Sequence, residues 1–209
     1  FVFMATANGT VKKTPLEQFS RPRPSGLIAL DLEEDNTLIG AAITDGSCDV
    51  MLCSNAAKAV RFKESDVRAM GRSAKGVRGI KLGAGQKVIS LLLPSAAGYL
   101  LTASENGYGK RTPLADFPMR GRGAQGVIAM QTSDRNGRLV GAVQVIDGDE
   151  LMLISNMGTL VRTSADEISL VGRNTQGVRL INLKEGELLN SVERIAESVD
   201  PDDESDAAS

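Results

Sequence analysis

One pattern occurs four times in this chain, and its third copy reads Leu101-Thr-Ala-Ser-Glu-Asn-Gly-Tyr-Gly-Lys-Arg-Thr112. Each copy has an apolar strand, a tight turn and a second strand with a basic residue. The turn residues recur at intervals of 48, 50 and 51 residues, and the basic residues keep these intervals. They are Gly9, Ala57, Gly107 and Gly158 at the turns, and Lys13, Arg61, Arg111 and Arg162 on the strands. A repeat of this length is typical of one supersecondary unit, so four similar units are predicted.

A second motif follows the turn in the last three copies and reads Gly-Arg-x-x-[Lys/Gln]-Gly-Val. It begins at Gly71, Gly121 and Gly172. In the first copy it degenerates to Arg21-Pro-Arg-Pro-Ser-Gly-Leu27. It is not a nucleotide-binding P-loop, because no Gly-Lys-Ser/Thr follows. Its outer glycines permit an exposed turn, so the arginine and the lysine or glutamine are expected to point outward.

Two further apolar strands follow the second motif in each repeat, for example Gly26–Leu32 with Thr37–Thr44. Each repeat therefore holds about four short strands with a period of two, while long helical periodicity is absent. Glycine follows Asn8 and Asn106 where a tight hairpin requires a positive φ. Such recurring four-stranded units predict an all-β, propeller-like disc. We expect one domain over residues 1–196, with blades at about 1–48, 49–98, 99–148 and 149–196.

The composition excludes several kinds of functional site. The chain has 209 residues and no histidine, which removes Ser-His-Asp triads, Cys-His pairs and histidine-bound zinc. Tyr99 and Tyr108 are expected to be packing residues rather than nucleophiles. Two cysteines, Cys48 and Cys53, are too few for a structural zinc site or a disulfide framework, and they indicate a reducing, cytoplasmic setting. We therefore predict no catalytic residue, no metal ligand and no cofactor bound by this chain.

The two ends of the chain differ from its body. Phe1-Val-Phe-Met4 follows no basic region, so we expect a strand cut from a longer protein and not a signal peptide. No run of about 18 apolar residues is present, so no membrane partner is predicted. Residues 197–209 hold six acids and no base, and we expect a disordered acidic tail there. Residues 1–196 then carry 24 bases and 20 acids, so the body is mildly basic.

The recurring basic residues form the candidate binding site. Arg72, Arg122 and Arg173 occupy the same place in successive loops, and a curved edge with regularly spaced guanidinium groups suits a polyanion. A second row of basic residues lies on the strands. The competing interpretation of this row is a set of solvated side chains that face water. The residues predicted to contact the ligand are Lys12, Lys13, Arg61, Lys63, Arg72, Lys75, Arg78, Lys110, Arg111, Arg120, Arg122, Arg162, Arg173 and Arg179.

The pattern of basic residues favours double-stranded nucleic acid. Stacking on single-stranded bases is not supported, because aromatic residues make up only 3% of the chain. The remaining mode of binding is contact with the phosphate backbone of a duplex, without preference for base sequence. Bending a site of about 20–30 base pairs costs several kcal/mol, which contacts spaced along a curved edge would offset. The prediction is therefore a non-catalytic module that binds and bends duplex DNA.

Several strings resemble one known family, the C-terminal DNA-wrapping domain of the A subunit of DNA gyrase. They are Asn8-Gly-Thr-Val-Lys-Lys13-Thr, Val60-Arg-Phe-Lys-Glu64-Ser, Val67-Arg-Ala-Met-Gly71, Gly76-Val-Arg-Gly79-Ile, Asn106-Gly-Tyr-Gly-Lys-Arg111-Thr and Val171-Gly-Arg-Asn-Thr-Gln-Gly177-Val. The resemblance covers residues 1 to about 196. It implies a β-pinwheel, a disc whose blades exchange a strand with their neighbours, and it implies that this chain holds the last four of six blades. The family's first blade carries the box Gln-Arg-Arg-Gly-Gly-Lys-Gly, which does not occur here.

The same resemblance implies a setting for the module. In the whole enzyme it would present a DNA segment for ATP-driven strand passage and negative supercoiling. The implied partners are the remainder of the gyrase A subunit, together with the gyrase B subunit, in an A2B2 heterotetramer, with ATP and Mg as cofactors of the whole enzyme. The implied location is the bacterial cytoplasm, at the nucleoid. The family's catalytic tyrosine lies in another domain, so this chain by itself is not expected to be an enzyme.

Two alternatives remain open from the sequence. The related C-terminal domain of the A subunit of topoisomerase IV has fewer blades and no box, although the strings here look closer to gyrase. A propeller-like scaffold for protein interactions is the alternative from another class, because a fold does not dictate a function. Such a scaffold is expected to expose aromatic anchors, which the scarcity of aromatic residues disfavours.

Overall fold

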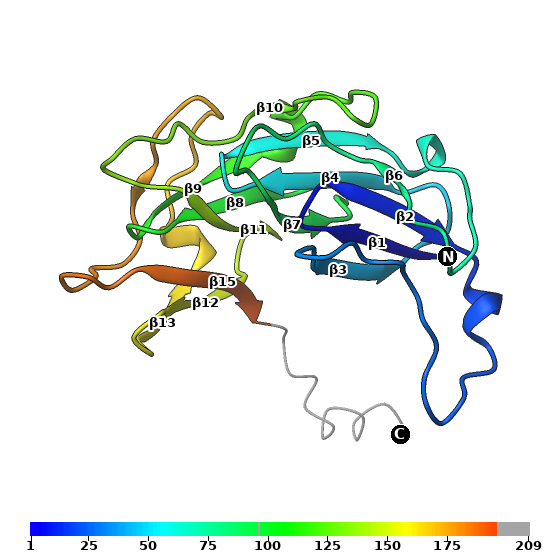
Figure 1. Ribbon diagram of the computed structural model, residues 1–209. Helices are drawn as coiled ribbons and strands as arrows, with labels where there is room; N and C mark the ends of the chain where they lie inside the picture. The colour runs from blue at the N-terminus through cyan, green and yellow to red at the C-terminus, as the bar shows by residue number, and fades with distance from the viewer. Residues whose placement is uncertain (96, 196–209) are drawn as a thin grey trace, which may run out of the picture.

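The computed structural model describes residues 1–95 and 97–195, which form fifteen strands in four antiparallel sheets (Figure 1). The first sheet consists of β1 (Val2–Thr6), β2 (Thr10–Thr14), β3 (Leu38–Ile43) and β6 (Val77–Arg78). The second consists of β4 (Asp49–Ser54), β5 (Lys58–Lys63), β7 (Val88–Leu92) and β10 (Val127–Ile128). The third consists of β8 (Tyr99–Ser104), β9 (Tyr108–Pro113), β11 (Leu139–Val145) and β14 (Val178–Arg179). The fourth consists of β12 (Glu150–Ser155), β13 (Leu160–Ser164) and β15 (Leu189–Ile195).

This architecture is the all-β, four-bladed propeller that the four repeats predicted. A short 3-10 helix follows the second strand of every repeat. These helices are η1 (Leu16–Phe19), η2 (Glu64–Asp66), η3 (Leu114–Asp116) and η4 (Ala165–Glu167). None of the helices in the described part of the chain has the length and apolar character needed to cross a membrane.

Each of the first three sheets takes its outer strand from the following repeat. In the first sheet the strand order is β3-β1-β2-β6, and β6 belongs to repeat two. The second and third sheets are completed by β10 and β14 in the same way. The paired residues are Val11 with Val77, Ala59 with Val127, and Gly109 with Val178. The strand exchange that the resemblance implied is therefore present, and a sheet in space is offset from a repeat in the sequence.

The strand predicted at Gly26–Leu32 is not formed. This segment corresponds to Val77, Val127 and Val178 of the later repeats, which pair with the sheet of the preceding repeat. Among the described residues no sheet precedes repeat one, and the side chain of Ile28 is 74% exposed. The local sequence pattern is similar to that of the later repeats. Such a short outer strand, however, forms only where the edge of a neighbouring sheet supplies its hydrogen bonds.

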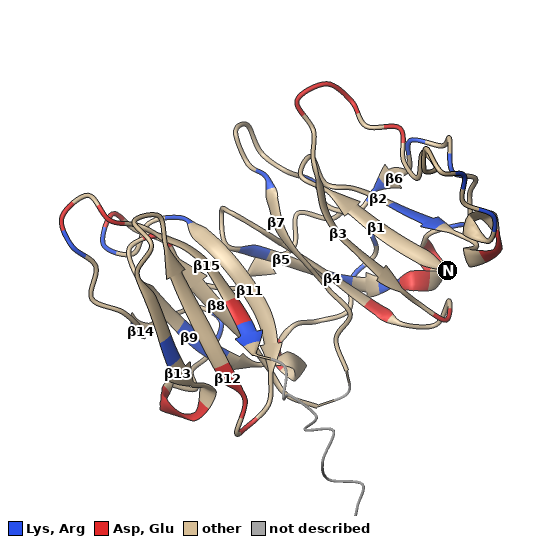
Figure 2. Ribbon diagram, turned by 90° about the horizontal axis from the view of Figure 1, so that it is seen from below, with Lys and Arg blue, Asp and Glu red and all other residues tan. Residues whose placement is uncertain are grey.

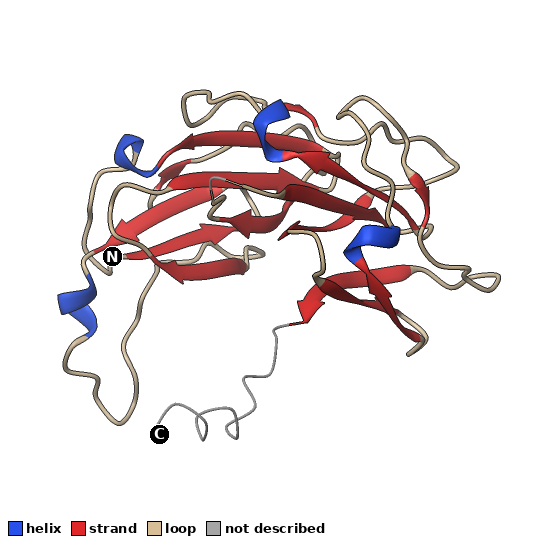
Figure 3. Cartoon of the chain, turned by 180° about the vertical axis from the view of Figure 1, so that it is seen from behind, coloured by secondary structure: helices blue, strands red, loops and turns tan. Residues whose placement is uncertain are grey.

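The innermost strands of the four sheets follow one another through the molecule. β3 contacts β7, β7 contacts β11, and β11 contacts β15. Two opposite views place the first and fourth sheets on opposite sides of the molecule (Figures 1 and 3). We call the opposite edge of the sheets the outer rim. It consists of β6, β10 and β14, together with the loops 71–76, 121–126 and 172–177 that lead into them.

The hairpin turns have the left-handed backbone that the sequence predicted. Gly9, Gly107 and Gly158 have φ of +86°, +81° and +83°. Ala57 occupies the same position in repeat two with φ of +55°, a region that residues with a Cβ rarely adopt. A Cβ at Gly107 would lie 2.8 Å from the carbonyl oxygen of Ile181, so the turn requires glycine there for space as well as for φ.

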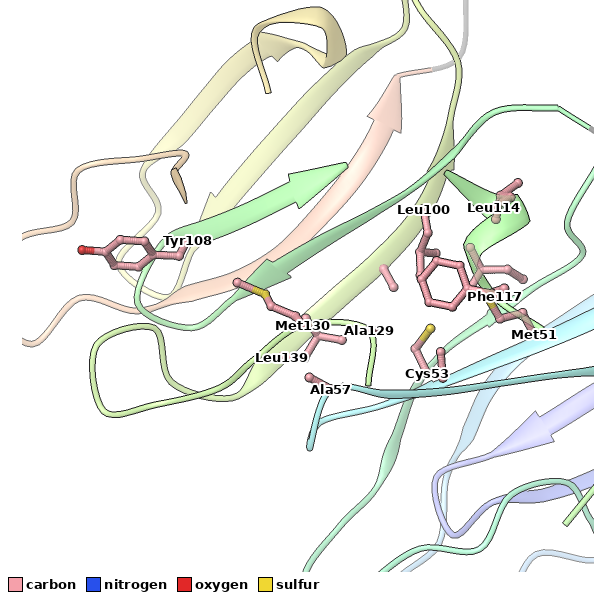
Figure 4. Close-up of a cluster of buried hydrophobic side chains, with 13 residues drawn as sticks. Met51, Cys53, Ala57, Leu100, Tyr108, Leu114, Phe117, Ala129, Met130 and Leu139 are labelled. Atoms are coloured by element: carbon pink, nitrogen blue, oxygen red, sulfur yellow. The ribbon is translucent and has the colours of Figure 1, made fainter. Parts of the chain in front are cut away.

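Buried apolar side chains fill the space between neighbouring sheets. Between the second and third sheets, Met51 and Cys53 pack against Leu100 and Phe117 (Figure 4). Truncation of a buried phenylalanine such as Phe117 to alanine costs about 3–5 kcal/mol. Burial raises the pKa of the Cys53 thiol to about 12, so this cysteine is a core residue and not a reactive one.

Candidate nucleic-acid interface

The basic residues on the strands face acids in the folded chain. We call Lys13, Arg61, Arg111 and Arg162 the strand row. Arg61 Nη2 lies 2.7 Å from Asp49 Oδ2, and Arg111 Nη1 lies 2.8 Å from Asp147 Oδ1. Lys13 pairs with Glu64, and Arg162 pairs with Glu150. Figure 2 shows blue segments on β2, β5, β9 and β13, the strands that carry this row.

Three members of the strand row also reach into the following repeat. Lys13 Nζ donates to the carbonyl oxygen of Glu64 at 3.3 Å, and Arg61 Nη1 donates to that of Leu114 at 3.0 Å. Arg111 Nε donates to the carbonyl oxygen of Ile168 at 2.9 Å. These acceptors lie on or directly after η2, η3 and η4. The recurrence of these cations is therefore explained by contacts between consecutive repeats.

Two further lysines on the same strands are enclosed by the protein. Lys12 is 1% exposed and donates to the carbonyl oxygens of Ala29 and Arg72. Lys110 is fully buried and donates to the carbonyl oxygens of Gly172 and Arg173. Burial, with the nearby Arg173 guanidinium, lowers the pKa of Lys110 to about 8. Burial also lowers the pKa of Lys12. Both ammonium groups hold the arginine loop of the next repeat from inside.

The structure divides the predicted contact set by burial. Lys12, Lys13, Lys110 and Arg111 are buried, and their side-chain nitrogens are already engaged by the protein. A phosphate group would have to displace those contacts to reach any of these four residues. Three others keep some exposure but have an acid within ion-pair distance. They are Arg61, Lys63 and Arg162.

The arginines of the second motif lie on the outer rim and contact neutral carbonyl groups. We call Arg72, Arg122 and Arg173 the loop row. Arg122 is exposed, and the other two are half-buried. Each Nη1 donates to one backbone carbonyl of the preceding repeat at 3.0–3.2 Å. Within the described residues none of the three forms an ion pair, so each retains its positive charge uncompensated.

Seven predicted contact residues remain on or beside the outer rim with no acid in ion-pair distance among the residues described. They are Arg72, Lys75, Arg78, Arg120, Arg122, Arg173 and Arg179. They come from repeats two, three and four, so the structure distributes them over successive blades. Near the first sheet, Asp31 and Glu33 line one groove together with Lys75 and Arg78, which weakens the positive field there.

Sequence reasoning missed Arg135, a cation beside the outer rim. The guanidinium carbon of Arg135 lies 4.7 Å from the centre of the Tyr108 ring, and that of Arg179 lies 5.3 Å from it. Arg179 Nη2 also donates to the Tyr108 hydroxyl at 2.7 Å. Hydrogen bonds from Arg135 and Arg179 lower the pKa of this phenol. Arg135 has no basic counterpart at the same place in the other repeats, so a search for recurrence could not find it.

One cluster of possible metal ligands lies away from the outer rim and consists of Asp45, Cys48 and Glu64. Its carboxylates are used by the chain itself. Glu64 accepts hydrogen bonds from the Thr44 hydroxyl and from the backbone N–H groups of Gly46 and Cys48. The backbone N–H of Ser47 is the main cause that lowers the pKa of Asp45 to about 2. This is the pattern of a capped turn.

The fold and the outer rim define a class of domain, a strand-exchanged β-propeller with a basic edge. A family model described as DNA gyrase C-terminal domain, beta-propeller, matches residues 1–45, 49–95, 98–146 and 149–196. The chain belongs to this family.

Curated relatives point the same way. The chain is 65% identical over 204 residues to the A subunit of DNA gyrase from Pseudomonas aeruginosa, covering 98% of this chain and 22% of that protein. It is 55% identical over 202 residues to the A subunit of DNA gyrase from Escherichia coli, covering 97% of this chain and 23% of that protein. The chain thus spans less than a quarter of these relatives. Their names favour gyrase over topoisomerase IV.

Two solved structures share the fold. A DNA gyrase A C-terminal domain superposes with a TM-score of 0.84 at 29% identity, over 93% of this chain and 65% of that one. A C-terminal domain of DNA topoisomerase IV superposes with a TM-score of 0.88 at 27% identity, over 93% of this chain and 61% of that one. Fold similarity alone therefore does not separate the two enzymes, whereas the curated relatives do.

Proposed function

We propose that this chain binds duplex DNA along its outer rim and bends it, without reading the base sequence and without catalysis of its own. The observation that carries the proposal is the uncompensated positive charge of the outer rim, which recurs from one blade to the next. Phosphate contacts of this kind position a duplex but carry no sequence information. Contacts on successive blades would hold the duplex at several points of a curved edge, which favours bending.

The strand row contributes less to this function than its recurrence in the sequence suggested. An acid already compensates each of its charges. A phosphate would have to displace that acid, and the counterion release that drives DNA binding would be small there. We therefore assign the DNA contacts to the seven uncompensated cations and to Arg135 beside them.

In the longer protein we propose the role of the DNA gyrase A C-terminal domain. The domain would wrap a DNA segment and present it for strand passage, which supports negative supercoiling. The remainder of the gyrase A subunit, together with the gyrase B subunit, would complete an A2B2 heterotetramer, with ATP and Mg used elsewhere in the assembly. The bacterial cytoplasm, at the nucleoid, is the corresponding location. The similarity to gyrase proteins of two bacteria supports this assignment.

A salt titration with linear duplex DNA tests the proposal. The logarithm of the binding constant should fall linearly with the logarithm of salt concentration, by about 0.9 per phosphate neutralised. With these seven cations and Arg135 all in contact, the slope should be no steeper than about −7. Fluorescence resonance energy transfer between the two DNA ends should rise on binding, which reports bending. A flat salt dependence, or strong preference for one sequence, would contradict the proposal.

A further inference from the structure

The three loop-row arginines make the same contact in three different places. Arg72 Nη1 donates to the carbonyl oxygen of Ile28 at 3.0 Å. Arg122 Nη1 donates to that of Arg78 at 3.2 Å, and Arg173 Nη1 donates to that of Ile128 at 3.0 Å. The acceptors occupy one equivalent position, the residue directly after the Val or Leu that ends the second motif. A contact that recurs in this way is part of the architecture and not a chance arrangement of surface side chains.

The contact joins outer strands that belong to neighbouring sheets. Arg78 lies on β6, the outer strand of the first sheet, while Arg122 lies in the loop that leads into β10, the outer strand of the second. Arg173 joins the loop before β14 to Ile128 on β10 in the same way. Arg122 and Arg173 therefore each span the boundary between two consecutive sheets at the outer rim, while Arg72 joins the loop before β6 to Ile28, which lies in no strand.

The loops have little regular structure of their own and are held by contacts with their surroundings. The second motif has no strand or helix before its last residue, and Gly76, Gly126 and Gly177 have positive φ. Backbone hydrogen bonds also cross the boundary, as from Lys81 N–H to the Ala124 carbonyl oxygen and from Gln131 N–H to the Thr175 carbonyl oxygen, both at 2.9 Å. Glycine-rich segments lose much entropy when they are ordered, so a directional side-chain contact adds to what these bonds and the buried lysines contribute.

Arginine is suited to this position because it can hold the loop and keep its charge. A guanidinium group has five N–H donors in a fixed plane, and a neutral carbonyl group compensates none of its charge. Arg122 uses Nε for the Asp66 carbonyl oxygen and Nη1 for the Arg78 carbonyl oxygen. The remaining donors can still face a phosphate. A lysine would keep the charge but not the planar set of donors.

We infer that Arg72, Arg122 and Arg173 are positioning residues that set the spacing between successive cationic loops of the outer rim. Through this spacing they determine how strongly a bound duplex is bent, separately from how tightly it is held. The inference rests on the proposed function, because the bend belongs to DNA bound at the outer rim. The contacts themselves exist without DNA, so one part of the test needs no ligand.

The test uses the triple variant Arg72→Lys, Arg122→Lys and Arg173→Lys, which keeps the net charge. Without DNA, amide hydrogen exchange in loops 71–76, 121–126 and 172–177 should become faster by about tenfold or more, as expected for the loss of one hydrogen bond to a charged group. With DNA, the salt slope should change by less than about one unit. The end-to-end energy transfer of bound DNA at saturation should fall clearly.

The control changes Arg138→Lys and Arg194→Lys, two exposed arginines away from the outer rim, and should leave both readouts at the parent values. Equal melting temperatures of the triple variant and the parent would exclude a general loss of folding. Unchanged loop exchange, or unchanged bending at full occupancy, would overturn the inference alone. A parent that does not bind duplex DNA would overturn the proposed function, and this inference with it.

Discussion

The strand row and the loop row look alike in the sequence and differ in the folded chain. The strand row recurs in all four repeats and the loop row in the last three, and members of both donate to carbonyl oxygens of a neighbouring repeat. The strand row is paired with acids, and two of its members are less than 9% exposed. The loop row has neutral acceptors only and stays accessible at the outer rim. Recurrence therefore identifies residues that join repeats, while the presence or absence of a compensating acid separates structural cations from candidates for DNA contact.

The physical reason lies in the cost of burying charge. A charge removed from water requires an opposite charge or several hydrogen bonds. Lys13 and Arg111 have such partners in Glu64, Asp147 and Asp166. Arg122 remains in water, where a hydrogen bond to a carbonyl oxygen is sufficient. The difference between the two rows leads to four predictions, which run from the largest expected effect to the smallest.

The largest effect is expected for Glu64→Ala in the strand row. Glu64 is fully buried, and the substitution removes the acceptor of the Thr44 hydroxyl and of two backbone N–H groups. It also leaves Lys13 without its carboxylate. Loss of one partner of a buried ion pair costs about 3–5 kcal/mol of folding free energy. Urea denaturation of the parent and the variant measures this loss. The salt slope of DNA binding by the folded variant should not change. A loss below about 1 kcal/mol would show that solvent replaces Glu64 easily.

The second effect concerns pH and Lys110. This lysine releases its proton near pH 8 in the folded chain, against an ordinary pKa of 10.5, because burial disfavours the charge. The unfolded chain therefore binds more protons between these values, and stability should rise with pH in that range. One proton gives a slope of at most about 1.4 kcal/mol per pH unit. Denaturation at pH 7.5 and 9.5 should show a steeper rise for the parent than for Lys110→Met. Parallel profiles would contradict the prediction.

The third effect concerns Arg78, an exposed cation of the outer rim. Arg78→Ala should lower the salt slope of DNA binding by about 0.9 and weaken affinity several-fold, because one phosphate contact is lost. Its stability should stay within about 0.5 kcal/mol of the parent, as usual for a surface substitution. Arg138→Ala is the matched control and should leave the slope unchanged. An unchanged slope for Arg78→Ala would remove this residue from the DNA path.

The smallest effect is expected for Arg162→Ala, the exposed member of the strand row. Its partner Glu150 is also partly exposed, and a pair of this kind contributes less than about 1 kcal/mol. DNA binding should keep the parent salt slope, because Glu150 already compensates the charge. A slope lowered by about one unit would place Arg162 on the DNA path and weaken the distinction between the two rows.

Much of the fold could be predicted from the sequence, because its decisive features are local. Period-two patterning and the turn glycines Gly9, Gly107 and Gly158 depend on residues a few positions apart. The recurrence of this local pattern predicted four similar units, and the structure confirms the four-bladed propeller. The strand predicted at Gly26–Leu32 failed because its existence depends on a neighbouring edge. The blade boundaries stay predictions, and the acidic tail at 197–209 lies outside the described residues.

For the candidate site, too, some features depend on local sequence and others on tertiary structure. The sequence by itself determined which cations recur, and it placed Arg72, Arg122 and Arg173 in equivalent loops. Only the tertiary structure decided what each cation faces. Arg61 meets the Leu114 carbonyl group 53 residues further on, and Lys110 meets Gly172 at a separation of 62 residues. Burial and compensating charge are set by such distant neighbours, because the free energy of an ion depends on everything packed around it and not on its place in a local pattern.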